Sequence, residues 1–244
     1  MAHPQTEPGP AARTRPPNDS PTELRTNAGD VALHEYHVTL GGHAYTILHT
    51  GAILTVEDEQ RLVSEGDTRL PYGLALWPAA IALAHEIASR ADEARGRHVL
   101  ELGAGTGLPG IVAASLGAVV VQTDRHPAAL SICRLNAERN RATTVEHRLG
   151  DWVLWDDAAR YDWIMGSDIL YAAAMHPHLS AIFDSNLAPG GRILLSDPFR
   201  RASLALLESL EAAGWTITLG KWSVGGEDDR CAVAVYELSR AREL

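Results

Sequence analysis

The sequence predicts an α/β fold in which helices cover both faces of a doubly wound, mostly parallel sheet. Strand-like and helix-like segments alternate from residue 97 onward, and a glycine-rich segment follows the first of these strands. The last two strands have no helix between them. The chain has 244 residues, of which 45% are hydrophobic, so it can bury the core of one large α/β domain or two small ones.

The N-terminal segment differs in composition from the rest of the chain. Residues 1–30 hold 6 of the 13 prolines and almost no large apolar residues, which predicts a disordered tail followed by one domain over residues 31–244. Two β-rich runs flank a Gly-Gly pair at 41–42 and should form a β-hairpin. We expect residues 31–76 to form this hairpin and a lid on a core of residues 77–244.

Seven strands are predicted in the core. The expected strands are residues 98–102, 118–124, 143–149, 162–168, 192–197, 215–219 and 231–238. The expected helices are residues 79–92, 107–116, 127–140, 171–187 and 203–213. Because only a short connection joins the last two strands, they should pair antiparallel at one edge of an otherwise parallel, Rossmann-like sheet.

Charge and cysteine content narrow the class of protein. The net charge is −10, with 21 basic against 31 acidic residues, which argues against a sequence-independent nucleic-acid binder. Two cysteines far apart, Cys133 and Cys231, favour a reducing compartment, and we expect a cytoplasmic protein. The start of the chain has no apolar signal-peptide region and no apolar run is long enough for a membrane helix, so no membrane partner is expected.

The most informative residues follow the first two core strands. Glu101, Gly103, Gly105 and Gly107 surround the end of the first strand, where glycines let the backbone turn tightly against a ligand. Asp124 ends the second strand, where a carboxylate can accept hydrogen bonds from ribose hydroxyls. Together these residues predict a site for an adenosine-type ligand.

The glycine spacing leaves two ligand classes to compare. Residues 105–110 match the G-x-G-x-x-G pattern of dinucleotide-binding proteins. However, the Glu101 carboxylate before the loop suits a cationic ligand better than a pyrophosphate. Further polar clusters at 150–152 and 167–171, and the antiparallel strand pair, also differ from a dinucleotide fold.

Residues from about 71 to 238 resemble a class I, seven-strand S-adenosylmethionine-dependent methyltransferase. The narrower resemblance is to methyltransferase family 16, which contains many protein-lysine methyltransferases. It rests on three segments: Leu76-Trp77-Pro78, Leu100 to Ile111, and Ser167-Asp168-Ile-Leu-Tyr171. The resemblance implies that S-adenosylmethionine is the cofactor. The residues it implies for cofactor binding are Trp77, Glu101, Gly103, Ala104, Gly105, Gly107, Asp124, Arg125, Asp151, Trp152 and Ser167.

The same resemblance implies transfer of a methyl group to a lysine side chain of a protein. Asp168 would then orient the acceptor amine and Tyr171 would shape its channel. A small-molecule methyltransferase with the same cofactor site is one alternative, and a non-catalytic module that binds the cofactor or a partner is another. Asp168 could also merely cap the following helix. Two roles are open for Trp77, core packing and cofactor contact. Two are also open for Trp152, loop packing and adenine contact.

Several other features are not expected to take part in catalysis or metal binding. The 11 histidines lack metal-ligand spacing, so no metal is expected. Arg200-Arg201 is taken as a solvated pair rather than a substrate contact. A monomer is favoured, while the acceptor's identity and the degree of methylation stay open. The segment Ser196-Asp197-Pro198 matches no family feature, and its role stays open too.

Overall fold

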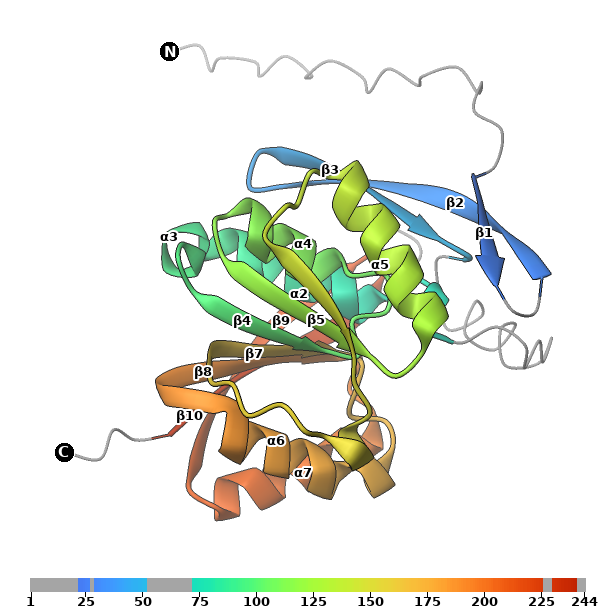
Figure 1. Ribbon diagram of the computed structural model, residues 1–244. Coiled ribbons are helices and arrows are strands. Elements are labelled where there is room, and N and C mark those ends of the chain that lie inside the picture. The colour runs from blue at the N-terminus through green and yellow to red at the C-terminus, as the bar shows by residue number, and fades with distance from the viewer. Residues whose placement is uncertain (1–21, 27–28, 52–71, 226–229, 241–244) are drawn as a thin grey trace, which may run out of the picture.

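The computed structural model describes residues 22–26, 29–51, 72–225 and 230–240. A mixed sheet of seven strands forms its centre (Figure 1). In spatial order the strands are β6 (Val145–Leu149), β5 (Val119–Asp124), β4 (His98–Leu102), β7 (Tyr161–Ser167), β8 (Leu187–Asp197), β10 (Cys231–Arg240) and β9 (Trp215–Val224). The first five strands in this order run parallel to one another, whereas β10 is antiparallel to both β8 and β9. The predicted seven-strand sheet with its antiparallel pair is therefore confirmed.

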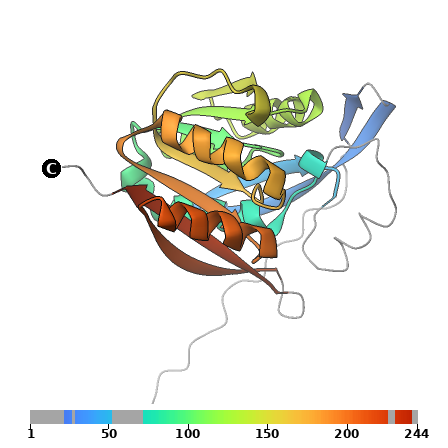
Figure 2. The same ribbon diagram turned by 90° about the horizontal axis from the view of Figure 1, so that it is seen from below.

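Helices cover both faces of this sheet, as predicted (Figures 1 and 2). One face carries α2 (Pro78–Ser89), α4 (Leu108–Ser115) and α5 (Pro127–Arg139), and the other carries α6 (His176–Asn186) and α7 (Arg201–Ala212). The short helical segments are η1 (Tyr72–Leu74), α3 (Ala91–Ala94), η2 (Trp152–Leu154) and η3 (Ala173–Met175). None of the helices in the described ranges is long and apolar enough to cross a membrane.

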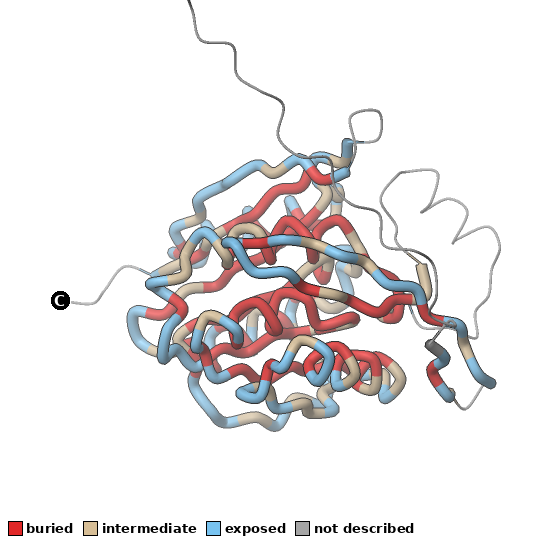
Figure 3. The backbone as a smooth tube through the Cα atoms, turned by 90° about the horizontal axis from the view of Figure 1, so that it is seen from above, coloured by how far each residue is buried: buried red, intermediate tan, exposed pale blue. Residues whose placement is uncertain are grey.

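The burial pattern explains why these helices pack where they do. Helix α2 is buried nearly all round, because it contacts α4 on one side and β8 and β10 on another. Two apolar clusters fill the space between sheet and helices, one on each face, and the buried stretches in Figure 3 run through the middle of the molecule. Helix α6 begins five residues later than the predicted start at Tyr171, because Pro177 sits in its first turn.

A second, three-stranded antiparallel sheet precedes the core. It contains β1 (Thr22–Thr26), β2 (Gly29–Leu40) and β3 (His43–His49), and the β2–β3 pair is the predicted hairpin. The predicted disordered tail through residue 30 is wrong at its end, because residues 22–26 form β1 and pair with the start of β2. The buried side chains of Leu24 and Leu33 pack on the same apolar cluster, which explains the order of this segment. The remainder of the predicted tail and most of the predicted lid lie outside the described residues.

Two asparagines, one in α5 and one at its C-cap, hold the three-stranded sheet against the core. The Asn136 side chain accepts a hydrogen bond from Leu48 N at 2.7 Å and donates to Leu48 O at 3.0 Å and to Thr106 O at 2.8 Å. One turn later, Asn140 makes the equivalent pair of bonds to the backbone of Thr46. These amides therefore satisfy the edge of β3 in the way that a neighbouring strand would.

Asn136→Ala should lower the free energy of unfolding by about 1–3 kcal/mol, because it leaves buried backbone groups of Leu48 without partners. Asn140→Ala is the matched control, since this side chain is less buried and water can replace it. Urea unfolding followed by circular dichroism measures both. Equal losses in the two variants would contradict the importance of burial at Asn136.

Candidate active site

The glycine-rich loop between β4 and α4 has the backbone that its sequence predicts. Gly103, Gly105 and Gly107 have φ angles of +61°, +55° and +80°, which side chains rarely tolerate. A Cβ atom on Gly103 would lie 3.0 Å from Ile169 Cγ2, and one on Gly105 would lie 3.1 Å from Gly73 O. The loop is thus enclosed by the segment after β7 on one side and by η1 on the other, and Ala104 between the glycines is buried.

Glu101 lies beneath this loop rather than on its open side. Its Oε2 atom accepts hydrogen bonds from Gly110 N at 3.0 Å and from Gln122 Nε2 at 2.7 Å, and Gln122 also donates to Gly107 O. Burial raises the pKa of Glu101 to about 7, although these hydrogen bonds oppose the shift. Among the described atoms its Oε1 is buried without a hydrogen-bond partner, so the carboxylate can still accept from a ligand or water.

Gly110 in the first half of α4 is required by that arrangement. A Cβ atom there would lie 2.4 Å from Glu101 Oε2 and 2.5 Å from Gln122 Nε2. Helix propensity alone would make Gly110→Ala stabilising by about 1 kcal/mol. We expect the collision of the Cβ atom with Glu101 and Gln122 to outweigh this gain, so that Gly110→Ala lowers the free energy of unfolding by about 1–3 kcal/mol.

Thermal or urea unfolding tests this expectation for Gly110→Ala. Gly220→Ala serves as the control, because its Cβ atom would lie 3.7 Å from Val235 O, an ordinary van der Waals contact. A Gly110→Ala protein that is as stable as the wild type would show that the Glu101–Gln122 pair can move aside at little cost.

Asp124 at the end of β5 lies beside the glycine loop, as predicted. Its Oδ2 atom accepts from Gly105 N at 3.2 Å and its Oδ1 atom accepts from His126 N at 2.8 Å. Burial raises the pKa of Asp124, and the two backbone hydrogen bonds offset part of that increase. Gly73 of η1 packs on this carboxylate, because its Cβ atom would lie 3.6 Å from Oδ2. The sequence reading missed Gly73, although its place in the Pro71-Tyr-Gly segment was a possible signal of close approach.

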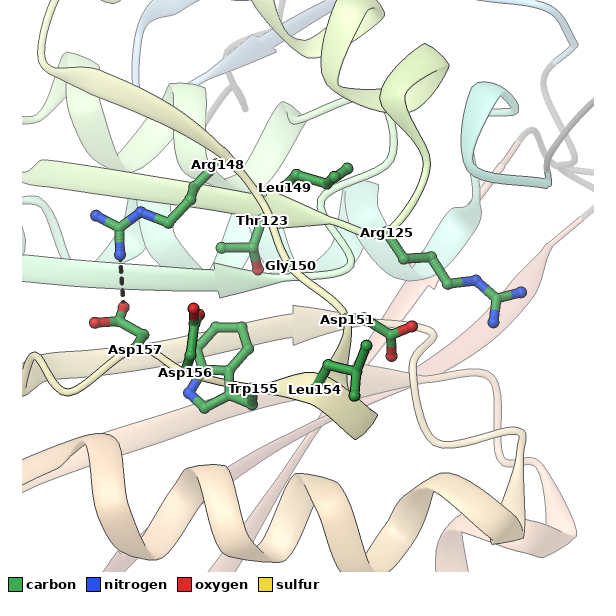
Figure 4. Close-up of a pocket in the computed structure, with 10 residues that line it drawn as sticks. All are labelled: Thr123, Arg125, Arg148, Leu149, Gly150, Asp151, Leu154, Trp155, Asp156 and Asp157. Atoms are coloured by element: carbon green, nitrogen blue, oxygen red, sulfur yellow. Dashed lines mark hydrogen bonds and ion pairs between the residues drawn. The ribbon is translucent and has the colours of Figure 1, made fainter.

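A pocket of about 300 Å³ opens next to the ends of β5 and β6 (Figure 4). It is lined by Thr123, Arg125, Arg148, Leu149, Gly150, Asp151, Leu154, Trp155, Asp156 and Asp157. The structure thus brings the predicted residues Arg125 and Asp151 to one pocket. Asp151 also accepts a hydrogen bond from Val153 N, which begins η2.

Trp152 does not line this pocket. Its ring lies against the glycine loop, since a Cβ atom on Gly103 would be 3.3 Å from Trp152 Cζ2. Trp77 is the N-cap residue of α2. Its Nε1 donates to Tyr72 O at 3.1 Å, and its ring is tilted by 53° to the Tyr72 ring with the centroids 6.4 Å apart. Both tryptophans are partly exposed at the edge of the sheet that holds the glycine loop.

Ser167 is the last residue of β7, the strand beside β4, and Asp168 and Tyr171 follow it. Because Leu102 pairs with Gly166, the segment after β7 emerges next to the glycine loop. The Tyr171 side chain is 59% exposed, so it stands at the surface rather than in a closed channel. Asp168 does not cap α6, whose N-cap is Met175, so the capping interpretation is wrong.

Asp168 forms a two-point ion pair with Arg200. Arg200 Nε donates to Oδ1 at 2.7 Å and Nη2 donates to Oδ2 at 2.8 Å. The interpretation of Arg200-Arg201 as a solvated pair is therefore wrong for Arg200. Two adjacent arginines in the sequence give no sign of this contact, because the partner Asp168 lies 32 positions before Arg200.

The segment Ser196-Asp197-Pro198, for which the sequence offered no role, supports this pair. Ser196 Oγ donates to Ala79 O at 2.7 Å, and Ser196 O accepts from Asp168 N at 2.8 Å. Asp197 Oδ1 accepts from Arg200 N at 2.6 Å, and burial raises the pKa of Asp197. In the described part of the chain, no group of three or more histidine, cysteine or acidic side chains is arranged to hold a metal ion.

The sheet order and the glycine loop define the class I S-adenosylmethionine-dependent methyltransferases. A solved precorrin-6y C5,15-methyltransferase from Geobacter metallireducens GS-15 has a similar fold, with a TM-score of 0.54, 17% identity, and coverage of 66% of this chain and 87% of that one. The lysine methyltransferase family matches residues 56–207, and the chain belongs to this family.

Curated relatives agree with that membership. Protein N-lysine methyltransferase METTL21A of Xenopus tropicalis is 36% identical over 137 residues, which cover 54% of this chain and 63% of that protein. METTL21A of Danio rerio is 34% identical over 160 residues, covering 62% of this chain and 72% of that protein. The chain thus spans somewhat less than two thirds of the frog protein and somewhat more of the fish protein.

Proposed function

We propose that the protein transfers a methyl group from S-adenosylmethionine to the ε-amino group of a lysine in a protein substrate. The observation that carries this proposal is the meeting of the glycine loop and Asp168 at the neighbouring ends of β4 and β7. The Asp168 carboxylate, although paired with Arg200, keeps oxygen lone pairs that can accept a hydrogen bond from an acceptor amine next to the cofactor. Membership of the lysine methyltransferase family, and the names of the two METTL21A relatives, support lysine as that acceptor.

The chain's own residues fit this cofactor. The left-handed glycines let the loop turn tightly at the end of β4, and among the described residues no donor bonds the buried Oε1 atom of Glu101. In the proposal Asp124 binds the ribose hydroxyls, Asp151 binds the adenine amino group and Trp152 packs beside the ring. Trp77, Ala104, Arg125 and Ser167 complete the surroundings. When bound, S-adenosylmethionine supplies an electrophilic methyl group on a sulfonium.

On the acceptor side, Asp168 would orient the amine and Tyr171 would border its entrance. In-line alignment of the amine nitrogen with the methyl carbon is the main requirement of such a displacement. The net charge of −10 would favour encounter with a basic substrate. We also propose that the protein is cytoplasmic and monomeric and that it does not bind nucleic acid.

Incubation with tritiated S-adenosylmethionine and a cell lysate tests this function. We expect counts in the protein fraction and methyl-lysine after acid hydrolysis, with Asp168→Asn as the low-activity comparison. Counts in the small-molecule fraction would favour the small-molecule alternative, and methyl-arginine would overturn the lysine assignment. Cofactor binding by calorimetry without transfer to either fraction would favour the non-catalytic alternative.

A further inference from the structure

The ion pair between Asp168 and Arg200 is built into the fold rather than formed by chance contact of two mobile side chains. Asp168 comes from the segment after β7 and Arg200 from the turn between β8 and α7, and the register Ser167 to Ser196 brings these segments together. The two side chains are only 8% and 25% exposed. A two-point guanidinium–carboxylate contact with little exposure is stronger and better oriented than a surface ion pair.

The backbone of Arg200 is held on both sides. Its N–H donates to the buried Asp197 carboxylate at 2.6 Å, and its carbonyl accepts from Ser203 Oγ at 2.5 Å. Phe199, the preceding residue, has a φ angle of +61°, a strained conformation that a rigid turn must maintain. Arg200 is therefore presented to Asp168 in one fixed geometry.

This pairing changes what Asp168 can do to an amine. A bare carboxylate in a partly buried site stabilises the ammonium form of a neighbouring amine, and an ammonium has no lone pair with which to attack. A carboxylate already paired with a guanidinium keeps oxygen lone pairs that can accept an N–H hydrogen bond, but exerts little net charge.

We propose that Arg200 is a positioning residue that neutralises and orients Asp168, so that the acceptor amine is held in its neutral, nucleophilic form. The proposal rests on the proposed function and assigns Arg200 a role in it. The acceptor ammonium first gives its proton to water, and Asp168 accepts a hydrogen bond from the neutral amine. The nitrogen lone pair then forms the N–C bond as the C–S bond breaks and its electron pair goes to sulfur. The methylated ammonium and neutral S-adenosylhomocysteine leave.

Other titratable groups lie in or beside this part of the molecule. They are Asp197 at the end of β8, Lys221 on β9, Tyr236 on β10, His176 at the start of α6 and Tyr171 after β7. Asp197 and Lys221 contribute opposite charges when ionised. Replacing Arg200 leaves these groups in place but removes the effect of its charge, which lowers the pKa of Asp197. A shift in pH dependence that arises through Asp168 is therefore recognised by its loss in a double variant that also lacks the Asp168 carboxylate.

Arg200→Met tests the proposal, with Arg201→Met as the matched control on the neighbouring exposed arginine. The acceptor is the lysate protein that the wild type labels, once purified, and the readouts are kcat and KM from pH 6 to pH 10. We expect Arg200→Met to move the midpoint of the kcat profile up by at least one pH unit, because unpaired Asp168 now favours the ammonium. At pH 7 kcat should fall at least tenfold and KM should fall as well, while cofactor affinity stays within twofold of the wild type.

A uniformly lower kcat with an unchanged midpoint would overturn the proposal, because a merely structural role predicts that result. The double variant Asp168→Asn, Arg200→Met should lose the upward shift, since the shift needs the carboxylate. If Arg200→Met does not fold, Arg200→Lys keeps the charge without the two-point contact and should show little midpoint shift but a lower kcat. A large upward shift with Arg200→Lys would contradict the assigned role of the charge.

A wild type that labels no protein would count against the proposed function alone. The inference is then tested with ¹³C-labelled butylamine and the S-adenosylhomocysteine complex, by following the pH titration of the bound amine by NMR. We expect the bound amine to have a lower pKa than free butylamine in the wild type and a higher one in Arg200→Met. Equal values in the two proteins would overturn the inference.

Discussion

Asp168→Asn should reduce kcat/KM for methyl transfer by about 10²-fold, because the acceptor amine is then no longer held in line with the methyl carbon. The asparagine keeps the shape of the side chain but removes its charge, so it leaves Arg200 without its two-point partner. The unpaired guanidinium would then repel an incoming ammonium. Affinity for S-adenosylmethionine should change little, because the carboxylate faces Arg200 rather than the glycine loop. Tyr171→Phe should have a smaller effect, since only an exposed hydroxyl is lost.

Raising the pH should partly restore kcat/KM in Asp168→Asn, because a larger fraction of the free acceptor is then already neutral. Asp184→Asn is the matched control, since it breaks an exposed aspartate–arginine pair far from the glycine loop in sequence and should leave transfer unchanged. Melting temperature, cofactor affinity and transfer are measured on the same samples. Near-normal transfer from a destabilised Asp168→Asn protein would restrict Asp168 to a structural role.

The features that could be predicted from the sequence are those encoded by neighbouring residues. Hydrophobic periodicity and the Gly-Gly pair at 41–42 were enough for the alternating core and the hairpin. The glycine loop was recognisable because its three left-handed positions lie within five residues. The seven strands and the antiparallel pair at one edge followed from the parallel alternation and the short final connection, whereas the order of the strands in the sheet was not predicted.

The features that could not be predicted depend on contacts between distant segments. The contact of Arg200 with Asp168 requires the register of β7 against β8, which no local pattern specifies. The support of β3 by Asn136 joins positions 88 residues apart. Composition failed at β1, because six prolines before residue 22 dominated the average of a segment whose last residues form a strand.

Asp124→Ala should weaken S-adenosylmethionine binding by about 10- to 150-fold, which corresponds to one lost charge-assisted hydrogen bond of about 1.5–3 kcal/mol. Part of the effect is indirect, because the same carboxylate accepts from Gly105 N and so supports the glycine loop. Asp124→Asn separates the two contributions. Its amide oxygen can still accept from His126 N, whereas its NH₂ group cannot replace the oxygen that faces Gly105 N.

Calorimetric titration with S-adenosylmethionine and thermal unfolding without it measure these two contributions independently. Asp162→Asn is the control, because Asp162 also accepts a backbone hydrogen bond, from His98 N at 2.9 Å, but at the opposite end of β4 from the glycine loop. All three variants should lose some stability, whereas only the two at Asp124 should lose cofactor affinity. If the dissociation constant of Asp124→Ala stays within twofold of the wild type while its melting temperature falls, the carboxylate only supports the loop. The ribose hydroxyls would then need another acceptor at the end of β5.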